Sequence, residues 1–199
     1  MSAKGLIDKY IASEAFYRLN SRFESACIKC DICLYGGSAL MFLNDLREVS
    51  LDVDYRIVSF EFSGEYNQED PEFLFRLAAM EVGEELGLGV TWMNDAAKIF
   101  ASRFEKYGEA MSFGDALTVF VPLPEYLLAM KCRCVRGESG NHDREDIISL
   151  MAVCGITTLE QLEENFRAFY PDQTLSSESL IRLESICMKF QQDRCRNEI

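Results

Sequence analysis

Positive charge and long apolar runs are both scarce in this sequence. Its 199 residues carry 20 Lys and Arg against 33 Asp and Glu, a net charge of −13. Such a surface repels a phosphate backbone, so any contact with RNA needs a local basic patch. No apolar stretch approaches the roughly 18 residues of a membrane span, and no membrane partner is expected. Residues 1–16 contain charges throughout and lack the apolar core of a signal peptide, which indicates a cytoplasmic protein.

Common signatures of several enzyme classes are also missing. The phosphate-binding pattern GxxxxGK[ST] and the hydrolase pattern GxSxG do not occur. The single histidine, His142, lies in a polar stretch, and we expect it to have no metal or catalytic role. Repeats and low-complexity tracts are absent. With 48% hydrophobic residues, the chain is long enough for one domain with a substantial core, or for a domain with a small helical appendage.

Eight cysteines are present, and we interpret them as reduced thiols, since no secretory signal is seen. Cys27, Cys30 and Cys33 form a CxxCxxC run, a spacing that zinc and iron–sulfur sites also use. The run passes from the end of a predicted helix into a predicted strand, and no matching CxxC follows. Small buried side chains are therefore favoured, with a metal-binding module as the alternative.

Acidic residues are concentrated between residues 61 and 90, where Arg76 is the only base. The eight acidic residues of this stretch are Glu61, Glu65, Glu69, Asp70, Glu72, Glu81, Glu84 and Glu85. We interpret the stretch as a solvated face, with a surface for a basic partner as the alternative.

The hydrophobic pattern predicts strands that alternate with helices, followed by helices alone. The predicted strands are residues 32–35, 51–62 and 116–121. The predicted helices are residues 5–29, 38–46, 71–86, 124–135, 143–154, 159–169 and 177–192, and residues 90–102 are ambiguous. This order predicts an α/β or α+β domain, with a sheet flanked by helices and a helical C-terminal part.

Two aspartates lie at the start of the predicted strand 51–62. Side chains two residues apart point to the same face of a strand, so Asp52 and Asp54 present two carboxylates together. Aspartate is unfavourable in strands, and adjacent carboxylates repel each other. A hard cation removes both difficulties, because Mg²⁺ binds one or two carboxylates together with substrate phosphates. An exposed edge strand with two unrelated acids is the alternative.

A glycine turn precedes these aspartates. Gly36 and Gly37 lie between a predicted strand and a predicted helix, and Ser38 is expected at the N-cap of that helix. Glycine lets the backbone approach a ligand closely, and the free N–H groups at a helix start attract phosphate. Ser38 has two candidate roles, binding phosphate through its hydroxyl or capping the helix. The turn, one helix and a DxD strand together predict a phosphate cradle beside a metal site.

With these motifs the sequence resembles the nucleotidyltransferase superfamily, which has the DNA polymerase β-like fold. Its hallmark is a glycine pair or Gly-Ser, a short spacer, and Asp-x-Asp or Asp-x-Glu between apolar residues. Gly37-Ser38, thirteen intervening residues and Asp52-Val53-Asp54 fit this pattern. The chain is most similar to the bacterial AbiEii-type and MenT-like group, which includes toxins of toxin–antitoxin pairs. The match covers roughly residues 30–155.

The resemblance implies a nucleotidyltransferase core with a mixed sheet in residues 1–122. It implies a helical C-terminal part, packed on that core, in residues 123–199. Lys131 is implied to contact the nucleotide phosphates, with Arg136 nearby.

The resemblance also implies a later acidic motif, which is Asp143 or Asp146, and we take Asp146 as the catalytic member. The superfamily often has a third carboxylate on a later strand, for which Asp115 is a candidate. The loop before Asp143 is longer than the group's pattern, so the assignment stays open among these three residues.

Without the resemblance, the same residues have simple structural roles as alternatives. Lys131 lies about 60–70° from an apolar stripe on its predicted helix, where a lysine that extends to solvent is the alternative. Asp143 and Asp146 have the spacing of an N-cap and its N3 acid, so Asp143 is expected to cap a helix.

The sequence therefore predicts a nucleotidyltransferase that depends on Mg²⁺ or Mn²⁺ and moves an NMP from an NTP to an acceptor hydroxyl. The acceptor is an RNA end such as tRNA, a protein or a small molecule, and an antitoxin protein is a further expected partner. For RNA the sequence offers one basic cluster, formed by Lys131, Arg133, Arg136 and Arg144. The alternative is a non-catalytic protein of this fold that binds nucleotide or a partner protein.

Overall fold

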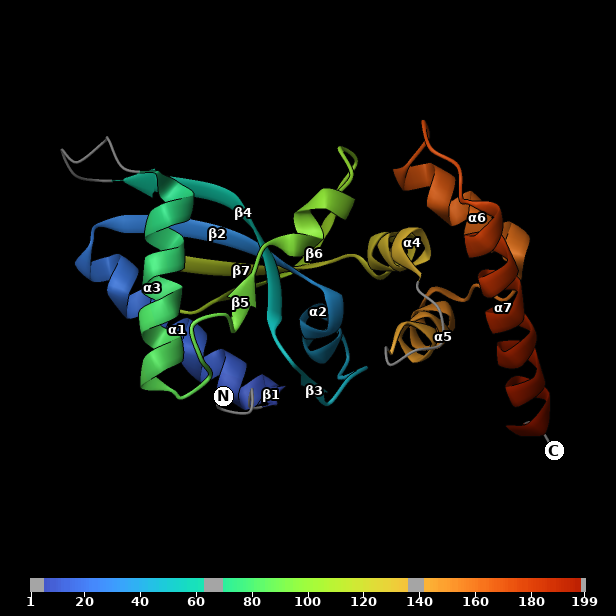
Figure 1. Ribbon diagram of the computed structural model, residues 1–199, viewed down its shortest axis with the longest axis horizontal. Helices are drawn as coiled ribbons and strands as arrows, with labels where there is room; N and C mark the ends of the chain where they lie inside the picture. The colour runs from blue at the N-terminus through green and yellow to red at the C-terminus, as the bar shows by residue number, and fades with distance from the viewer. Residues whose placement is uncertain (1–5, 63–69, 136–141, 198–199) are drawn as a thin grey trace. The chain divides into compact units, whose positions relative to one another are not determined.

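The structure is a computed structural model that describes residues 6–62, 70–135 and 142–197 (Figure 1). It contains a five-stranded mixed sheet flanked by helices and a helical C-terminal part, which confirms the predicted fold class. Among the described residues, no helix combines the length and the apolar character that crossing a membrane requires.

The chain forms two compact units. The first comprises the described residues of Met1–Ile99 together with Tyr107–Pro122. The second comprises Phe100–Lys106 together with the described residues of Leu123–Ile199.

The first unit is built on a sheet with the strand order β5-β4-β2-β7-β6. Its strands are β2 (Ile28–Tyr35), β4 (Val53–Phe62), β5 (Met93–Asn94), β6 (Tyr107–Ser112) and β7 (Leu117–Pro122). The central strand β2 pairs antiparallel with β4 and parallel with β7. At the edges, β5 is parallel to β4 and β6 is antiparallel to β7. A separate pair is formed by β1 (Ile7–Asp8) and β3 (Val49–Ser50).

Four helical segments complete the first unit. They are α1 (Lys9–Ser25), α2 (Gly36–Phe42), α3 (Pro71–Glu85) and the 3-10 helix η1 (Ala96–Phe100), whose last residue joins the second unit. Helix α1 is shorter than the predicted 5–29. It begins after Asp8, whose carboxylate accepts a hydrogen bond of 2.8 Å from Ile11 N, and it ends before residues that pair in the sheet instead.

The core of the first unit lies where α1 and α3 pack over one face of the sheet (Figure 1). Aromatic rings link the layers, because Phe75 of α3 stacks on Tyr55 of β4 at 4.5 Å and approaches Phe23 of α1 at 5.6 Å between ring centroids. Burial alternates along β4, where Val53 and Tyr55 are buried and Asp54 between them is half-exposed. This alternation assigns each strand residue to the core face or the open face.

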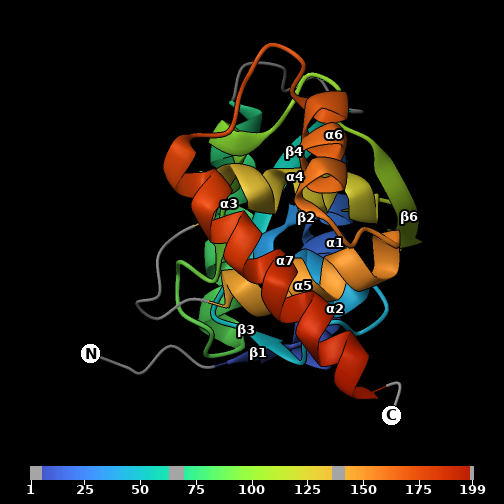
Figure 2. The same ribbon diagram turned by 90° about the vertical axis from the view of Figure 1, so that its right-hand side faces the viewer.

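The second unit contains four helices, with α7 packed on α5 and α6 (Figure 2). They are α4 (Pro124–Cys134), α5 (Asp143–Cys154), α6 (Leu159–Phe169) and α7 (Ser177–Asn197). Local signals set several of their ends. Thr158 and Gln161 form a capping box at the start of α6, and Gly155 ends α5 with a φ of 66°.

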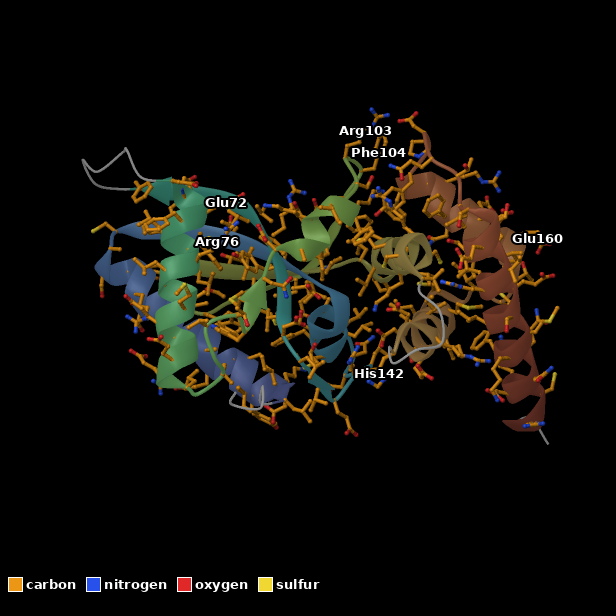
Figure 3. The ribbon with its side chains drawn as sticks, in the orientation of Figure 1. Glu72, Arg76, Arg103, Phe104, His142 and Glu160 are labelled. Carbon is orange, nitrogen blue, oxygen red and sulfur yellow. The ribbon has the colours of Figure 1, made fainter. Side chains whose placement is uncertain are left out.

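The segment Phe100–Lys106, which includes Arg103 and Phe104 (Figure 3), belongs to the second unit and forms hydrogen bonds with residues of α4 and with Tyr170, which follows α6. Tyr170 Oη donates to Phe100 O at 2.6 Å, and Ser102 N donates to Tyr126 Oη at 2.8 Å. Arg133 also donates to Phe100 O, and its guanidinium lies over the ring of Tyr170. Arg133 is therefore part of the packing of this unit, which the sequence alone did not indicate.

Asn20 connects α1 to the start of β7. Its side chain is buried, and its Oδ1 accepts hydrogen bonds from the backbone N–H groups of Ala116 at 3.0 Å and Leu117 at 3.1 Å. Its Nδ2 donates to Glu24 Oε1 at 2.8 Å. One side chain thus satisfies two backbone donors of another element.

We expect Asn20→Leu to lower the free energy of unfolding of the first unit by about 2–4 kcal/mol, because it leaves two buried N–H groups without an acceptor. Urea unfolding followed by the fluorescence of Trp92, the single tryptophan, which is buried in this unit, measures the change. Ser21→Ala is the control, since its exposed hydroxyl only donates to Tyr17 O within α1, and its effect should stay within about 0.5 kcal/mol. Equal stability of the two variants would contradict this role of Asn20.

Candidate functional site

The glycine turn and the second aspartate of the DxD pair lie in direct contact. Tyr35, the last residue of β2, is the sheet partner of Asp54, and α2 begins at Gly36. Gly36 has a φ of 57°, in the left-handed region that favours glycine. A Cβ at Gly36 would overlap Asp54 Oδ2 and lie 3.1 Å from Asp54 Cγ. Only glycine therefore leaves room for this carboxylate beside the turn.

The two aspartates share one side of the strand, as predicted. Asp52 lies just before β4 and Asp54 is its second residue, and both are half-exposed while Val53 between them is buried. Asp52 Oδ2 accepts a hydrogen bond of 3.0 Å from Asn94 Nδ2 of β5. Asn94 lies in the segment whose structure the sequence left ambiguous, so its contact with the DxD pair was missed.

The expected position of Ser38 at an N-cap is wrong. Tyr35 is the N-cap residue of α2, and Ser38 is the third residue of the helix. Its side chain is fully buried, and its hydroxyl donates to Tyr35 O at 2.8 Å. The helix starts two residues earlier than predicted because Gly36 adopts the turn itself. The Ser38 hydroxyl thus stabilises the turn through the backbone of Tyr35. Helix α2 has only seven residues.

Arg47 is a residue near the turn that sequence reasoning missed. A Cβ at Gly37 would lie 2.7 Å from Arg47 Nη1 and 2.9 Å from Ser50 Oγ, so the guanidinium rests against the turn. Arg47 Nε donates to Val49 O at 2.8 Å, which fixes the side chain. The sequence did contain a signal for this position, because Arg47 is the single basic residue in the spacer between Gly37 and Asp52.

The donor set around the turn fits a hard divalent cation that keeps some of its own ligands. Two carboxylates supply oxygen, and Mg²⁺ commonly binds one or two carboxylates together with water and phosphate oxygens. Among the described residues, no group of three or more His, Cys, Asp or Glu side chains is arranged to hold a metal. Asp52 and Asp54 are the described residues near the turn that could supply carboxylate ligands to such a cation.

Asp115, the candidate third carboxylate on a later strand, lies far from the DxD pair. It is exposed in the turn before β7, whose first residue, Leu117, pairs with Cys30 near the start of β2. Asp54 pairs with Tyr35 at the other end of β2. Five residues along a strand span about 17 Å, so Asp115 is excluded from a site at the turn.

The CxxCxxC run is only partly buried. Cys30 and Cys33 lie in β2 with their side chains in the interior, and burial raises the pKa of the Cys30 thiol. Cys27 follows α1 and is exposed, so the expectation of burial is wrong for this residue.

Lys131 is buried in the second unit and ion-paired with both later aspartates. Its Nζ lies 3.1 Å from Asp143 Oδ1 and 2.7 Å from Asp146 Oδ2, and all three side chains are buried. The alternative of a lysine that extends to solvent is wrong, because α4 is buried around its whole circumference from Tyr126 to Cys132. The three charges connect α4 to the first turn of α5.

The pKa of Lys131 reflects two opposing influences. Burial alone lowers it by penalising the ammonium, but the Asp146 carboxylate, followed by that of Asp143, more than offsets this penalty. The net result is a raised pKa, so the lysine stays charged. The predicted contact of Lys131 with nucleotide phosphates stays a prediction.

The structure also corrects the expected helix cap of α5. His142 is the N-cap residue, it is exposed (Figure 3), and its side chain makes no capping hydrogen bond. Asp143 is the first residue of the helix and binds Lys131 instead of capping. Arg136, predicted near the phosphates, lies outside the described residues. Since Lys131 and Arg133 are engaged inside the second unit, they form no open basic surface for RNA.

We expect Lys131→Met to lower the free energy of unfolding of the second unit by about 3–5 kcal/mol, because it removes the buried ammonium that pairs with both carboxylates. Hydrogen exchange of the α4 and α5 amides measures the change. Lys189→Met is the control, since Lys189 pairs with Asp193 on the surface, and removing that pair should cost no more than about 1 kcal/mol.

Neutralising the partners as well, with Asp143→Asn and Asp146→Asn, should restore part of the loss, and no recovery would contradict the ion-pair explanation.

A raised lysine pKa also sets a pH dependence. The stabilisation is present below the ordinary pKa of 10.5 and should fade as the pH rises through the raised value.

Comparisons of the chain with protein-family models, with curated proteins and with solved structures give no match. The likeness to nucleotidyltransferases therefore rests on the motifs, and the geometry of the turn and the DxD pair carries the functional argument.

Proposed function

We propose that this protein is a nucleotidyltransferase that uses Mg²⁺ or Mn²⁺ to move an NMP from an NTP to an acceptor hydroxyl. The main support for this proposal is the contact between Gly36 and the Asp54 carboxylate. It places a turn made of two glycines directly beside the DxD pair. A triphosphate with its metal needs this combination, since the metal requires oxygen ligands and the phosphates require close access to backbone N–H groups.

Each residue of the site has a role in this proposal. A cation held by Asp52 and Asp54 would neutralise charge on the phosphates and align them. The Gly36–Gly37 backbone accommodates the phosphates, and Arg47 beside Gly37 adds a guanidinium, which suits phosphate oxygens. Asn94 holds the Asp52 carboxylate in place through its hydrogen bond.

The reaction would form a bond between the acceptor oxygen and the α-phosphorus and break the bond from that phosphorus to pyrophosphate. Asp146, which is ion-paired with Lys131 in the second unit, stays the candidate later catalytic residue that the resemblance implies. The acceptor is an RNA end, a protein or a small molecule, and the direct test is to find which of these gains label.

That test supplies each NTP with a labelled α-phosphate, together with Mg²⁺ and either total tRNA or a cell extract. We expect the label to appear on one acceptor class with release of pyrophosphate. Metal-dependent NTP binding with no pyrophosphate release would favour the alternative, a binding protein of the same fold. No binding of any NTP would exclude both transfer and nucleotide binding, and would leave the partner-binding form of the alternative.

We expect Asp54→Asn to abolish transfer and to weaken Mg²⁺-dependent NTP binding at least about tenfold, equivalent to about 1.4 kcal/mol, because it removes one charged metal ligand. Isothermal titration with each NTP and Mg²⁺ measures the binding. Glu61→Gln is the control, since it neutralises an exposed acid at the other end of β4 and should bind as the wild type does. Equal behaviour of the two variants would remove the DxD pair from the site.

We expect Gly36→Ala to weaken NTP binding much more than Gly87→Ala. Both glycines have positive φ, 57° and 69°, so alanine brings similar backbone strain at each. Only at Gly36 does the added Cβ overlap Asp54, whereas at Gly87 nothing lies within 4 Å. Comparable NTP affinities in the two folded variants would show that the contact between the turn and Asp54 is not part of a binding site.

A further inference from the structure

Helix α3 exposes an apolar stripe on the surface of the first unit. Phe73, Leu77 and Met80 are 60%, 43% and 41% exposed, although all three are large and hydrophobic. Their spacing of four and three residues places them on one face of the helix, over about 10 Å of its length. Apolar side chains grouped in this way mark an interaction surface more often than scattered ones do.

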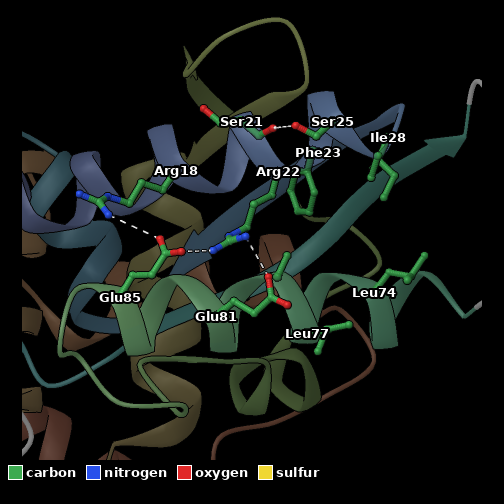
Figure 4. Close-up of a pocket in the computed structure, with 12 residues that line it drawn as sticks. Arg18, Ser21, Arg22, Phe23, Ser25, Ile28, Leu74, Leu77, Glu81 and Glu85 are labelled. Atoms are coloured by element: carbon green, nitrogen blue, oxygen red, sulfur yellow. Dashed lines mark hydrogen bonds and ion pairs between the residues drawn. The ribbon is translucent and has the colours of Figure 1, made fainter.

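The stripe borders a groove of about 560 Å³ between α1 and α3. Phe23 and Ile28 line the α1 side and Leu74 and Leu77 line the α3 side, so the walls are mainly apolar (Figure 4). At the other end, Arg22 pairs with Glu81 at 2.9 Å and also with Glu85. The groove is therefore apolar toward Ile28 and Leu74, and toward Glu85 ion pairs cross it from α1 to α3.

The charge of the first unit indicates what such a surface binds. Residues 1–99 and 107–122 contain 9 Lys and Arg against 19 Asp and Glu, a net charge of −10 out of the −13 of the whole chain. The exposed stripe is flanked by four glutamates, which are Glu72, Glu81, Glu84 and Glu85. Three of them are ion-paired within the unit: Glu72 with Arg76 (Figure 3) and Lys98, Glu81 with Arg22, and Glu85 with Arg18 and Arg22. The net charge of the unit is nevertheless strongly negative, which disfavours a second copy of the chain.

We infer that the exposed stripe of Phe73, Leu77 and Met80 on α3 binds an amphipathic helix of another protein, which lays its apolar face on the stripe and carries basic residues on its flanks. Such a helix presents apolar anchors at i, i+3, i+4 and i+7, and these extend over about 10 Å, the length of the stripe. The glutamates of α3 then form part of the surface for a basic partner. This inference is independent of nucleotide transfer, because it concerns the helices that cover the core face of the sheet.

A fluorescently labelled helical peptide of about 18 residues, with leucines at i, i+3, i+4 and i+7 and lysines elsewhere, is the probe. We expect saturable binding to the full chain that weakens as salt rises. Leu77→Glu, and separately the more exposed Phe73→Ser, should each weaken binding about tenfold or more, because they remove apolar anchors. Trp92 fluorescence reports that α3 stays folded, since Trp92 Nε1 donates to Ala79 O at 2.6 Å.

Ile181→Glu is the matched control, because Ile181 is 68% exposed on α7 in the second unit, and this variant should bind the peptide as the wild type does. Nucleotide binding should be unchanged in all three variants. The inference is overturned if the wild type fails to bind the peptide, if a glutamate-flanked peptide binds equally well, or if Ile181→Glu weakens binding as much as Leu77→Glu. A dimer in solution that Leu77→Glu dissociates would also overturn it, in favour of a second copy.

Discussion

The register between β2 and β4 is the constraint on which the first unit and its candidate site depend. Leu34 pairs with Tyr55, and both are buried on the face covered by α1 and α3. A slip of one residue would turn Asp54 into that core, which burial of an unpaired charge forbids. The same register places Asp54 beside Tyr35, so that the chain leaves β2 at Gly36 directly against a carboxylate. Core packing thus decides where the polar site forms.

A second set of charges is placed inside the protein, where electrostatics and burial oppose each other. Lys131, Asp143 and Asp146 are buried together, and each loses hydration that its ion pairs offset in part. Such an arrangement contributes little net stability, but removing one member is costly, so it favours the packing of α4 and α5 that keeps the charges together. This buried triad gives Lys131, Asp143 and Asp146 a structural role, whether or not they also contact nucleotide.

The two proposals concern different surfaces of the first unit, one polar and one apolar. The polar site lies at the end of β2 and the start of β4, where a turn and two half-exposed aspartates meet. The apolar stripe of α3 belongs to the helical layer that covers the core face of the same sheet. Because different residues form the polar site and the apolar stripe, a substitution in one of them should leave binding at the other unchanged. An acidic first unit is compatible with both, since metal offsets the charge at the first surface and a basic helix offsets it at the second.

Much of this protein was determined by local sequence signals. Helix α6 occupies the predicted residues 159–169, since a capping box and a clear apolar period define it. The alternation around Asp52 and Asp54 predicted which side of β4 they share. The short strands β1, β3 and β5 and the exposed strand β6 were missed, because two-residue pairings and exposed strands carry no hydrophobic pattern.

Only the tertiary structure decided the partners of the charged and polar side chains. Helical periodicity placed Lys131 at the flank of an apolar stripe, yet the packing of α4 against α5, α6 and α7 buries it beside two aspartates. The positions of Arg47 beside Gly37 and of Asn94 beside Asp52 depend on strand pairing between segments that the sequence separates. The sequence by itself determined which residues face the core and where most helices begin, because these follow from local periodicity and capping. Which charges meet depends on long-range packing, and local patterns hold no information about it.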